Sequence, residues 1–248
     1  MAVDQILAKM ATRLSARYPL DGSDREAVLS LPVKIRKGKA GDYLVREGET
    51  PYRCAFLHSG FAYRQKSATG GGRQIVALLI PGDFVDLQQI FLNISDHSVQ
   101  LMTDAELTEI GIGEMRSVAM KHPTISRAMW LDALIESSIY REWLLNVGQR
   151  DARSRIAHFL CEIAVRLQLS GFADGDSYEL PMTQEQLGDA VGLTSVHVNR
   201  VLQALAKERL IERKKRRIAV PDWTRLRDVA DFNQRYLHLD QADPLTIS

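Results

Sequence analysis

Cysteine is scarce in this sequence. Its two cysteines, Cys54 and Cys161, lie more than 100 residues apart. Disulfide frameworks need several cysteines, and Cys-x-x-Cys metal or redox pairs need close spacing, so the sequence contains neither. We expect each thiol to be a small, buried apolar side chain.

Long apolar runs are also absent. The longest uninterrupted run, Ile75 to Ile80, is far shorter than the roughly 20 residues that cross a bilayer as a helix. The N-terminus lacks the order of charged, apolar and small residues that marks a secretory signal. The sequence therefore predicts a cytoplasmic protein without a membrane partner.

The residue groupings that usually carry catalysis are missing too. No Ser-His-Asp set, no metal-binding spacing of histidines and no His-x-His pair can be assembled. Gly70-Gly71-Gly72 lacks the Gly-Lys-Ser/Thr ending of a phosphate loop and lies between two strand-like segments, so it predicts a hairpin tip. We therefore expect no enzymatic activity and no metal site.

The chain does have an ordinary globular composition with an uneven distribution of charge. Hydrophobic residues make up 45% of the 248 residues and charged residues 25%, which excludes a mostly disordered chain. The formal net charge is only +1, but residues 200–217 carry eight Lys or Arg against two Glu. This cluster favours an anionic partner.

The apolar pattern changes along the chain and predicts an α+β fold. Residues 4–18 have helical spacing, whereas residues 31–113 alternate short apolar runs with Gly and Pro, as in an antiparallel β-roll. Helical spacing resumes after Pro123 and continues without Gly until residue 148, and another amphipathic helix is expected at 151–168. The segment GFADGDS after it predicts a loop.

Four consecutive parts follow from these changes. They are a β-roll domain with a leading helix at 1–122, a dimerisation helix at 123–148, a C-terminal domain at 149–235 and a tail at 236–248. The apolar stripe of the long helix needs a partner, and we favour the same helix of a second copy, through Leu131, Ile135 and Ile139. Packing within one chain is the alternative.

Residues 183–205, TQEQLGDAVGLTSVHVNRVLQAL, contain two helix starts twelve residues apart. Thr183 and Gln186 fit a capping box, Gly192 can end the first helix in the left-handed conformation, and Thr194 can cap the second. The expected buried residues are Leu187, Ala190, Val191, Val198, Val201, Leu202 and Leu205. Two short helices joined by a turn with Gly predict a helix-turn-helix.

The outer face of the second helix has the side chains that read a DNA groove. Arg200 can fork onto guanine, Asn199 can pair with adenine or a phosphate, and Val196 can touch a thymine methyl. Ser195 completes the expected base contacts, and Thr194, Ser195 and His197 are expected to donate to phosphate. The segment LIERKKRRIAV predicts a hairpin, the wing, that lays its cations along the phosphate backbone: Arg213, Lys214, Lys215, Arg216 and Arg217.

With the order of roll, long helix and winged helix-turn-helix, the chain resembles the Crp-Fnr family of bacterial transcription regulators over residues 30–222. TQEQLGDAVGLTSVHVNRVLQALAKERLI is the specific part, supported by PGDF at 81–84. The resemblance implies a homodimer that binds a palindromic promoter site and an effector that binds in the roll. Whether RNA polymerase is also a partner is left open. A protein-interaction module and non-specific nucleic-acid binding are alternatives, although protein docking does not require the excess of positive charge.

The sequence departs from the family at several positions. Val196 stands where many members place a glutamate, so the half-site should differ from the familiar ones. Members that bind cyclic AMP carry Gly-Glu and Arg-Ser/Thr in the roll, where this chain has Asp86, Leu87 and His97. These residues cannot supply the ribose and phosphate contacts, so cyclic AMP in the usual pose is not expected.

Other effectors are left open. An iron–sulfur cluster is not expected, because its cysteine ligands are missing. Haem, and with it gas sensing, would need His58 or His97, although a lone histidine is more often structural. Arg64 and Arg73 beside the hairpin tip could meet an anion or face solvent. The candidate effector residues are Arg64, Arg73, Asp86 and His97.

Overall fold

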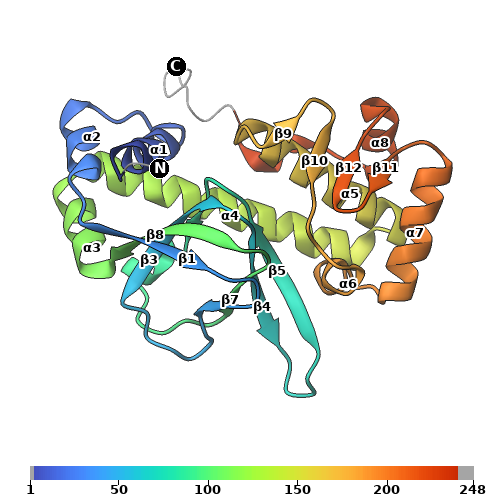
Figure 1. Cartoon of the computed structure of the whole chain (residues 1–248), viewed down its shortest axis with the longest axis horizontal. Helices are drawn as coiled ribbons and strands as arrows, with labels where there is room; N and C mark the ends of the chain where they lie inside the picture. Colours follow the sequence, from blue (N-terminus) through green and yellow to red (C-terminus); the bar gives the residue numbers. More distant parts are fainter. Residues whose placement is uncertain (1–2, 240–248) are drawn as a thin grey trace. The chain divides into compact units, whose positions relative to one another are not determined.

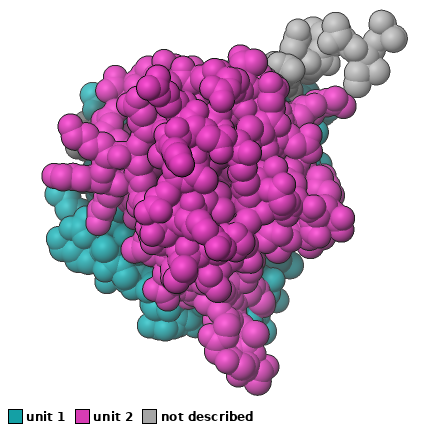
Figure 2. Space-filling model, turned by 90° about the vertical axis from the view of Figure 1, so that its right-hand side faces the viewer, with its two compact units in different colours: residues 1–62, 79–138, 237–248 teal, residues 63–78, 139–236 magenta. Residues whose placement is uncertain are grey.

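The computed structural model describes residues 3–239, so residues 240–248 of the expected tail lie outside the described residues. The described chain forms two compact units. The first comprises residues 3–62, 79–138 and 237–239, and the second comprises residues 63–78 and 139–236 (Figure 2). The units are not consecutive stretches of sequence, because residues 63–78 belong to the second one.

The first unit contains the predicted antiparallel roll. Its strands are β1 (Val33–Gly38), β2 (Tyr43–Val45), β3 (Arg53–Ser59), β6 (Phe84–Val85), β7 (Ser98–Leu101) and β8 (Ala105–Gly111). One sheet has the order β1-β8-β3-β6, and β2 pairs with β7; every pairing in this unit is antiparallel (Figure 1).

Strand β3 shows why the roll has a filled interior. Successive side chains of a strand point to opposite faces. Cys54 and Phe56 accordingly pack with one apolar cluster, and Ala55 and Leu57 pack with the other. Both faces of this strand are therefore buried, which stabilises the sheet from two sides.

Helices cover the cluster around Cys54 and Phe56. They are α1 (Val3–Ser15), α2 (Gly22–Leu29), the 3₁₀ helix η1 (Leu87–Ile90), α3 (Ile112–Lys121) and the first turns of α4 (Figure 1). The leading helix was predicted. Three helices were not: α2 begins at a capping box of Asp21 and Asp24, and η1 and α3 occupy segments where the sequence predicted no helix.

The long helix is α4 (Pro123–Gln149), which confirms a single continuous helix after Pro123. Its apolar residues do not share one environment. Ile135 is 4% exposed and Trp143 is buried, whereas Trp130, Leu134 and Leu144 are largely exposed. An exposed apolar stripe therefore remains on α4.

The second unit contains the predicted hairpin and the C-terminal helices. Strands β4 (Ala62–Ser67) and β5 (Arg73–Leu79) are neighbours, and the amide of Ala68 donates to the carbonyl of Gly72, which confirms a hairpin tip at the three glycines. The hairpin is residues 63–78 of the magenta unit in Figure 2. Helices α5 (Ala152–Leu169), α6 (Gln184–Val191), α7 (Ser195–Lys207) and α8 (Trp223–Ala230) follow, with η2 (Gln234–Leu237).

A small sheet accompanies these helices. Its order is β11-β12-β10-β9, with β9 (Ala173–Asp174), β10 (Ser177–Glu179), β11 (Glu212–Lys214) and β12 (Arg217–Ala219). The expectation of a plain loop at GFADGDS was wrong, because this segment is a β9–β10 hairpin that pairs with the wing. The guanidinium of Arg217 donates to Asp174 and Ser177 and joins the two hairpins.

Within the second unit, a buried carboxylate fixes the end of α4 against α5. Glu162 on α5 accepts hydrogen bonds from Trp143 Nε1 at 2.9 Å and from the Tyr236 hydroxyl at 3.0 Å. Arg166, one turn further along α5, lies 3.3 Å from the same carboxylate. Burial raises the pKa of Glu162 despite these partners. The network joins α4, α5 and η2.

Candidate nucleic-acid interface

The two helices of the predicted helix-turn-helix have the expected ends. Thr183 and Gln186 form the reciprocal capping box at the start of α6, and Gly192 ends α6 with φ at 67°. The Thr194 side chain accepts from the amide of His197 and caps α7. All seven residues that the sequence predicted to be buried in this segment, from Leu187 to Leu205, are buried. Local sequence signals therefore set this element.

Close backbone packing sets the angle of the turn. The amide of Leu193 donates to the carbonyl of Gly188 over 3.0 Å. A Cβ atom on Gly188 would overlap the carbonyl oxygen of Leu193. Only glycine permits this approach, which brings the start of α7 close to α6.

Arg155, near the start of α5, also fixes the turn and was not identified from the sequence. Its guanidinium donates to the carbonyl of Val191 at 2.9 Å and to the carbonyl of Arg150 at 2.9 Å. These carbonyls belong to the end of α6 and to the junction between α4 and α5. The sequence gives no signal for this role of Arg155, because the carbonyl groups that it binds lie on other elements.

The six residues expected to contact DNA on α7 lie together at its first two turns. Ser195, Val196 and Arg200 are exposed, with Val196 at 77%, and His197 and Asn199 are half-buried. Thr194 is exposed beside them, although its hydroxyl already caps the helix. Asn199 is held by α6, because Gln184 Nε2 donates to Asn199 Oδ1 over 2.9 Å. Gln184 was not singled out in the sequence.

The wing presents a run of five exposed cations, Arg213 to Arg217. Arg217 is paired with Asp174 at 3.1 Å. Within residues 3–239, no carboxylate forms an ion pair with the other four, so they keep their charge available for an anion. Lys215 lies at the tip with φ at 55°, a left-handed backbone conformation that residues other than glycine rarely adopt.

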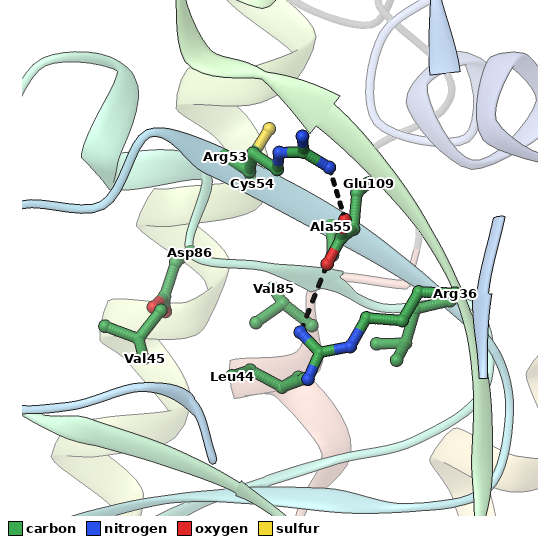
Figure 3. Close-up of a pocket in the computed structure, with 10 residues that line it drawn as sticks. Arg36, Leu44, Val45, Arg53, Cys54, Ala55, Val85, Asp86 and Glu109 are labelled. Atoms are coloured by element: carbon green, nitrogen blue, oxygen red, sulfur yellow. Dashed lines mark hydrogen bonds and ion pairs between the residues drawn. The ribbon is translucent and has the colours of Figure 1, made fainter. Parts of the chain in front are cut away.

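The roll encloses a small cavity of about 40 Å³ (Figure 3). Glu109 lies between two arginines on its wall: Arg36 Nη1 is 3.1 Å from Oε1, and Arg53 Nη1 is 2.6 Å from Oε2. Ligand sites for small molecules usually measure about 300–1,000 Å³, whereas one water needs about 10–15 Å³. The cavity therefore has room for a few waters and not for a nucleotide.

Asp86 and His97 meet in the first unit, as two of the four candidate effector residues. Asp86 is fully buried, and its Oδ1 lies 3.0 Å from His97 Nε2. His97 Nδ1 lies 2.8 Å from Asp96, so both ring nitrogens have a carboxylate partner. At these positions, where the resemblance places effector contacts, each side chain therefore has a partner within the protein.

Arg64 and Arg73 belong to the second unit, and neither faces solvent alone. Arg64 is 2% exposed and donates to the hydroxyl of Tyr140 on α4 over 3.1 Å. Arg73 Nε donates to Asp189 on α6 over 2.8 Å. The sequence left open whether Arg64 and Arg73 meet an anion or face solvent. In the structure, Arg64 is buried beside Tyr140, and Arg73 pairs with the acidic side chain of Asp189.

The two histidines considered for haem both have protein partners. His58 Nε2 lies 2.5 Å from Thr108 Oγ1, and burial lowers the pKa of His58. Cys54 and Cys161 are buried, as predicted, and burial raises the pKa of each thiol to about 12. Between residues 3 and 239, no group of three or more His, Cys, Asp and Glu side chains is arranged to hold a metal ion.

In the same range, no helix combines the length and the apolar content that a membrane span requires.

Two family models match the chain. Residues 35–122 match the cyclic nucleotide-binding domain, and residues 154–229 match the Crp-like helix-turn-helix domain. The first range covers most of the roll with η1 and α3. The second covers most of α5, both small hairpins, the helix-turn-helix and most of α8.

Curated relatives span most of the chain. "Transcriptional activator protein FnrL" of Cereibacter sphaeroides is 29% identical over 212 residues, which cover 84% of this chain and 85% of the relative. "Transcriptional activator protein FnrA" of Stutzerimonas stutzeri is 25% identical over 82% of this chain and 83% of its own. Among solved structures, FixK2 from Bradyrhizobium japonicum has a TM-score of 0.75 at 22% identity and covers 80% of this chain and 98% of its own. The last similarity shows that the fold is shared.

Proposed function

Because this chain belongs to the Crp-Fnr family of transcription regulators and carries the family's DNA-binding domain, we propose that it binds a specific palindromic operator as a homodimer. One observation supports the proposal above the others. The exposed first turns of α7 belong to the same unit as a wing with four unpaired cations. A probe helix with base-reading side chains and a phosphate-binding hairpin are the two parts that such recognition requires.

The two parts have different tasks in the proposal. Arg200 and Val196 read base edges in the major groove, and Ser195 and His197 donate to phosphates. The wing cations, Arg213 to Arg216, add affinity that does not depend on sequence and that weakens with salt. Arg217 contributes less, because Asp174 already neutralises part of its charge.

The exposed stripe on α4 supports the homodimer. Trp130, Leu134 and Leu144 are spaced by four and ten residues, which places them on one seam of a coiled coil. Ile135, one of the three residues expected from the sequence, is buried within the chain, while Leu131 and Ile139 are half-buried. We therefore centre the pairing on Trp130, Leu134 and Leu144. A two-fold pair would read two half-sites roughly 34 Å apart.

The roll supports control that does not use cyclic AMP. The cavity of about 40 Å³ is far below the volume of a nucleotide site, and the Asp86 carboxylate is held beside His97. A different small molecule that binds in this cavity would have to enlarge it. Calorimetry with cyclic AMP should detect no binding, and saturating cyclic AMP should leave operator affinity unchanged within about twofold.

Selection of binding sites from random duplexes, followed by binding isotherms at several salt concentrations, tests the proposal. Arg200→Ala should cost about 1–3 kcal/mol on the selected site and relax one base position. Lys214→Ala should weaken specific and random duplexes alike and reduce the salt slope by about one.

Three results would contradict the proposal or part of it. Recovery of no preferred duplex would end the claim of sequence-specific binding. Equal losses from both substitutions on specific and random duplexes would show that α7 does not read bases. A selected site without two-fold symmetry would remove the homodimer from the proposal.

A further inference from the structure

Exposed apolar side chains gather on one loop of the first unit. Residues 91–94, which we call the apolar loop, follow η1 directly, and all four are exposed. Phe91, Leu92 and Ile94 are 55%, 54% and 62% exposed. Single exposed apolar residues are ordinary on a protein surface, whereas a contiguous group of them marks an interaction site. The apolar loop is therefore a candidate interaction surface.

Hydrogen bonds hold the backbone on both sides of the apolar loop. Before the loop, Arg116 Nε donates to the carbonyl of Ile90 over 2.7 Å. After the loop, the amide of Ser95 donates to the carbonyl of Glu49 over 2.9 Å, and the carbonyl of Ser95 accepts from the amide of Gly48 over 2.8 Å. A surface that is fixed before binding loses less conformational freedom when a partner arrives. The apolar loop is therefore suited to hold its side chains ready for contact.

Phe91 joins the apolar loop to the exposed stripe of α4. Its ring stacks on the ring of Trp130, with 6.2 Å between the centroids and 21° between the planes. Trp130 is 59% exposed, and Leu134, one turn further along α4, is 55% exposed. The loop and this part of α4 both belong to the first unit. One continuous apolar surface therefore runs from Phe91 to Leu134.

The area of the α4 stripe also favours an additional contact. The exposed parts of Trp130, Leu134 and Leu144 together measure on the order of 400 Å². A stable interface buries about 800 Å² of each partner. The three apolar side chains of the loop add an area comparable to that of the stripe. Stripe and loop together therefore approach the area that a stable dimer requires.

Resting on the homodimer of the proposed function, we infer that the apolar loop belongs to the dimer surface and packs against α4 of a second copy of this chain. The second copy lies along the stripe that contains Trp130, and it also meets Phe91, because the two rings stack. A two-fold interface uses the same patch on both chains, so the contact between loop and helix occurs twice. The dimer surface then combines α4 with a loop of the roll.

Sedimentation velocity over a concentration series tests the inference with Ile94→Glu. Ile94 is exposed in the single chain, so the substitution should leave the fold intact, which thermal unfolding checks. A carboxylate placed in a desolvated interface is unfavourable, so the dissociation constant of the dimer should rise at least about tenfold. If Ile94→Glu associates as tightly as the unmodified chain, the inference is overturned.

Leu169→Glu is the matched control. Leu169 is 62% exposed, as Ile94 is, but it lies at the end of α5 in the second unit. This variant should associate as the unmodified chain does. Equal dissociation of the two variants would show a general effect of added charge and would also overturn the inference.

Hydroxyl-radical footprinting of the unmodified chain gives a second measurement that needs no variant. Oxidation of Phe91 and Leu92 should fall several-fold between concentrations below and above the dissociation constant of the dimer. Oxidation of Leu169 should not change.

The homodimer and the role of the apolar loop fail in different ways. If the unmodified chain remains a monomer at every concentration and on its selected duplex, the homodimer of the proposed function fails, and the inference fails with it. If the chain dimerises and Trp130 is protected while Phe91 and Leu92 are oxidised as in the monomer, the homodimer stands and only the role of the apolar loop is overturned.

Discussion

At the scale of single residues, His158 shows how the core of the second unit controls a titratable group. His158 is fully buried on α5, and its ring stacks on Tyr236 at 5.7 Å between centroids. Its Nε2 lies 3.2 Å from Glu142 Oε1, outside hydrogen-bonding geometry. Burial and the nearby Arg150 lower the pKa of His158 to about 3, so the imidazole is neutral in the folded protein.

Acid should therefore destabilise the chain through His158. The histidine titrates near 6.5 when unfolded and near 3 when folded, so below pH 6.5 the unfolded state binds a proton that the folded state does not. The stability that the neutral, buried His158 contributes is fully present above pH 6.5 and is lost as the pH falls towards 3. Between pH 7 and pH 5 it should remove about 2 kcal/mol from the free energy of unfolding.

Denaturant titrations at the two pH values measure this loss. His158→Phe keeps an aromatic ring at the position and removes the titration, so its stability should fall less over the same interval. Identical pH dependence of the two proteins would mean that the pKa of His158 is the same in the folded and unfolded states.

Residues with local signals could be predicted from sequence, and residues with distant partners could not. Thr183, Gly192 and Thr194 act on backbone within three or four residues, so the sequence reveals their roles. Gln184 acts on Asn199 15 positions away, and Arg155 acts on Val191 36 positions away. Such partners are known only once the fold brings them together.

At the scale of elements, Gly188 provides a sharp test of the helix-turn-helix. A Cβ atom at this position would overlap the Leu193 carbonyl, so Gly188→Ala must push α6 and α7 apart. We expect a loss of about 1–3 kcal/mol in unfolding free energy, together with weaker operator binding. Thermal unfolding and binding isotherms measure the two effects.

Gly148→Ala is the control for that substitution. Gly148 lies in α4 with no neighbour within 4 Å of the added Cβ atom. Alanine there should be neutral or stabilising by up to about 1 kcal/mol, because it favours the helix. Similar destabilisation by both substitutions would show that the close approach of Gly188 to Leu193 does not make a Cβ atom at position 188 more destabilising than one at position 148.

The β4–β5 hairpin is an element whose partner the sequence did not indicate. Arg73 pairs with Asp189, and Gln74 Nε2 donates to the Ala190 carbonyl over 3.2 Å, so the hairpin is tied to α6. A double-mutant cycle of Arg73→Ala and Asp189→Ala should give a coupling free energy of about 1 kcal/mol. The exposed Lys39–Asp104 pair should couple less. Additive losses at Arg73 and Asp189 would mean that the tie contributes no stability.

Element prediction succeeded where periodicity was long and failed where segments were short. The spacing of apolar residues in α4 and α5 extends over several turns, so both helices were predicted nearly to their ends. Helix α2 has eight residues and few apolar ones, and its signal is the capping pair Asp21 and Asp24. Strands β9 and β10 are two and three residues long, too short for a period of two to be recognised.

At the scale of the whole molecule, the exposed stripe of α4 predicts the oligomeric state. Leu144 is 75% exposed in one chain, so Leu144→Glu should leave the fold intact while placing a charge in the proposed pairing surface. We expect the dissociation constant of the dimer to rise at least about tenfold, which is 1.4 kcal/mol. Sedimentation velocity over a concentration series measures this change.

Leu169→Glu is the control, because Leu169 is 62% exposed at the end of α5 and lies outside the stripe. It should remain a dimer. Equal dissociation of both variants would indicate a general effect of surface charge, and unchanged association of Leu144→Glu would place the homodimer surface elsewhere.

At Lys215, the left-handed backbone lowers the stability of the fold, whereas the lysine side chain adds affinity for DNA in the proposed function. A lysine in that conformation costs roughly 1–2 kcal/mol relative to glycine, and it lies at the first position of a two-residue turn where glycine is preferred. Lys215→Gly should make the protein harder to unfold and at the same time loosen its hold on every duplex. The tip of the wing therefore has an unfavourable backbone conformation, and in the proposed complex the lysine there provides a positive charge for the phosphate backbone.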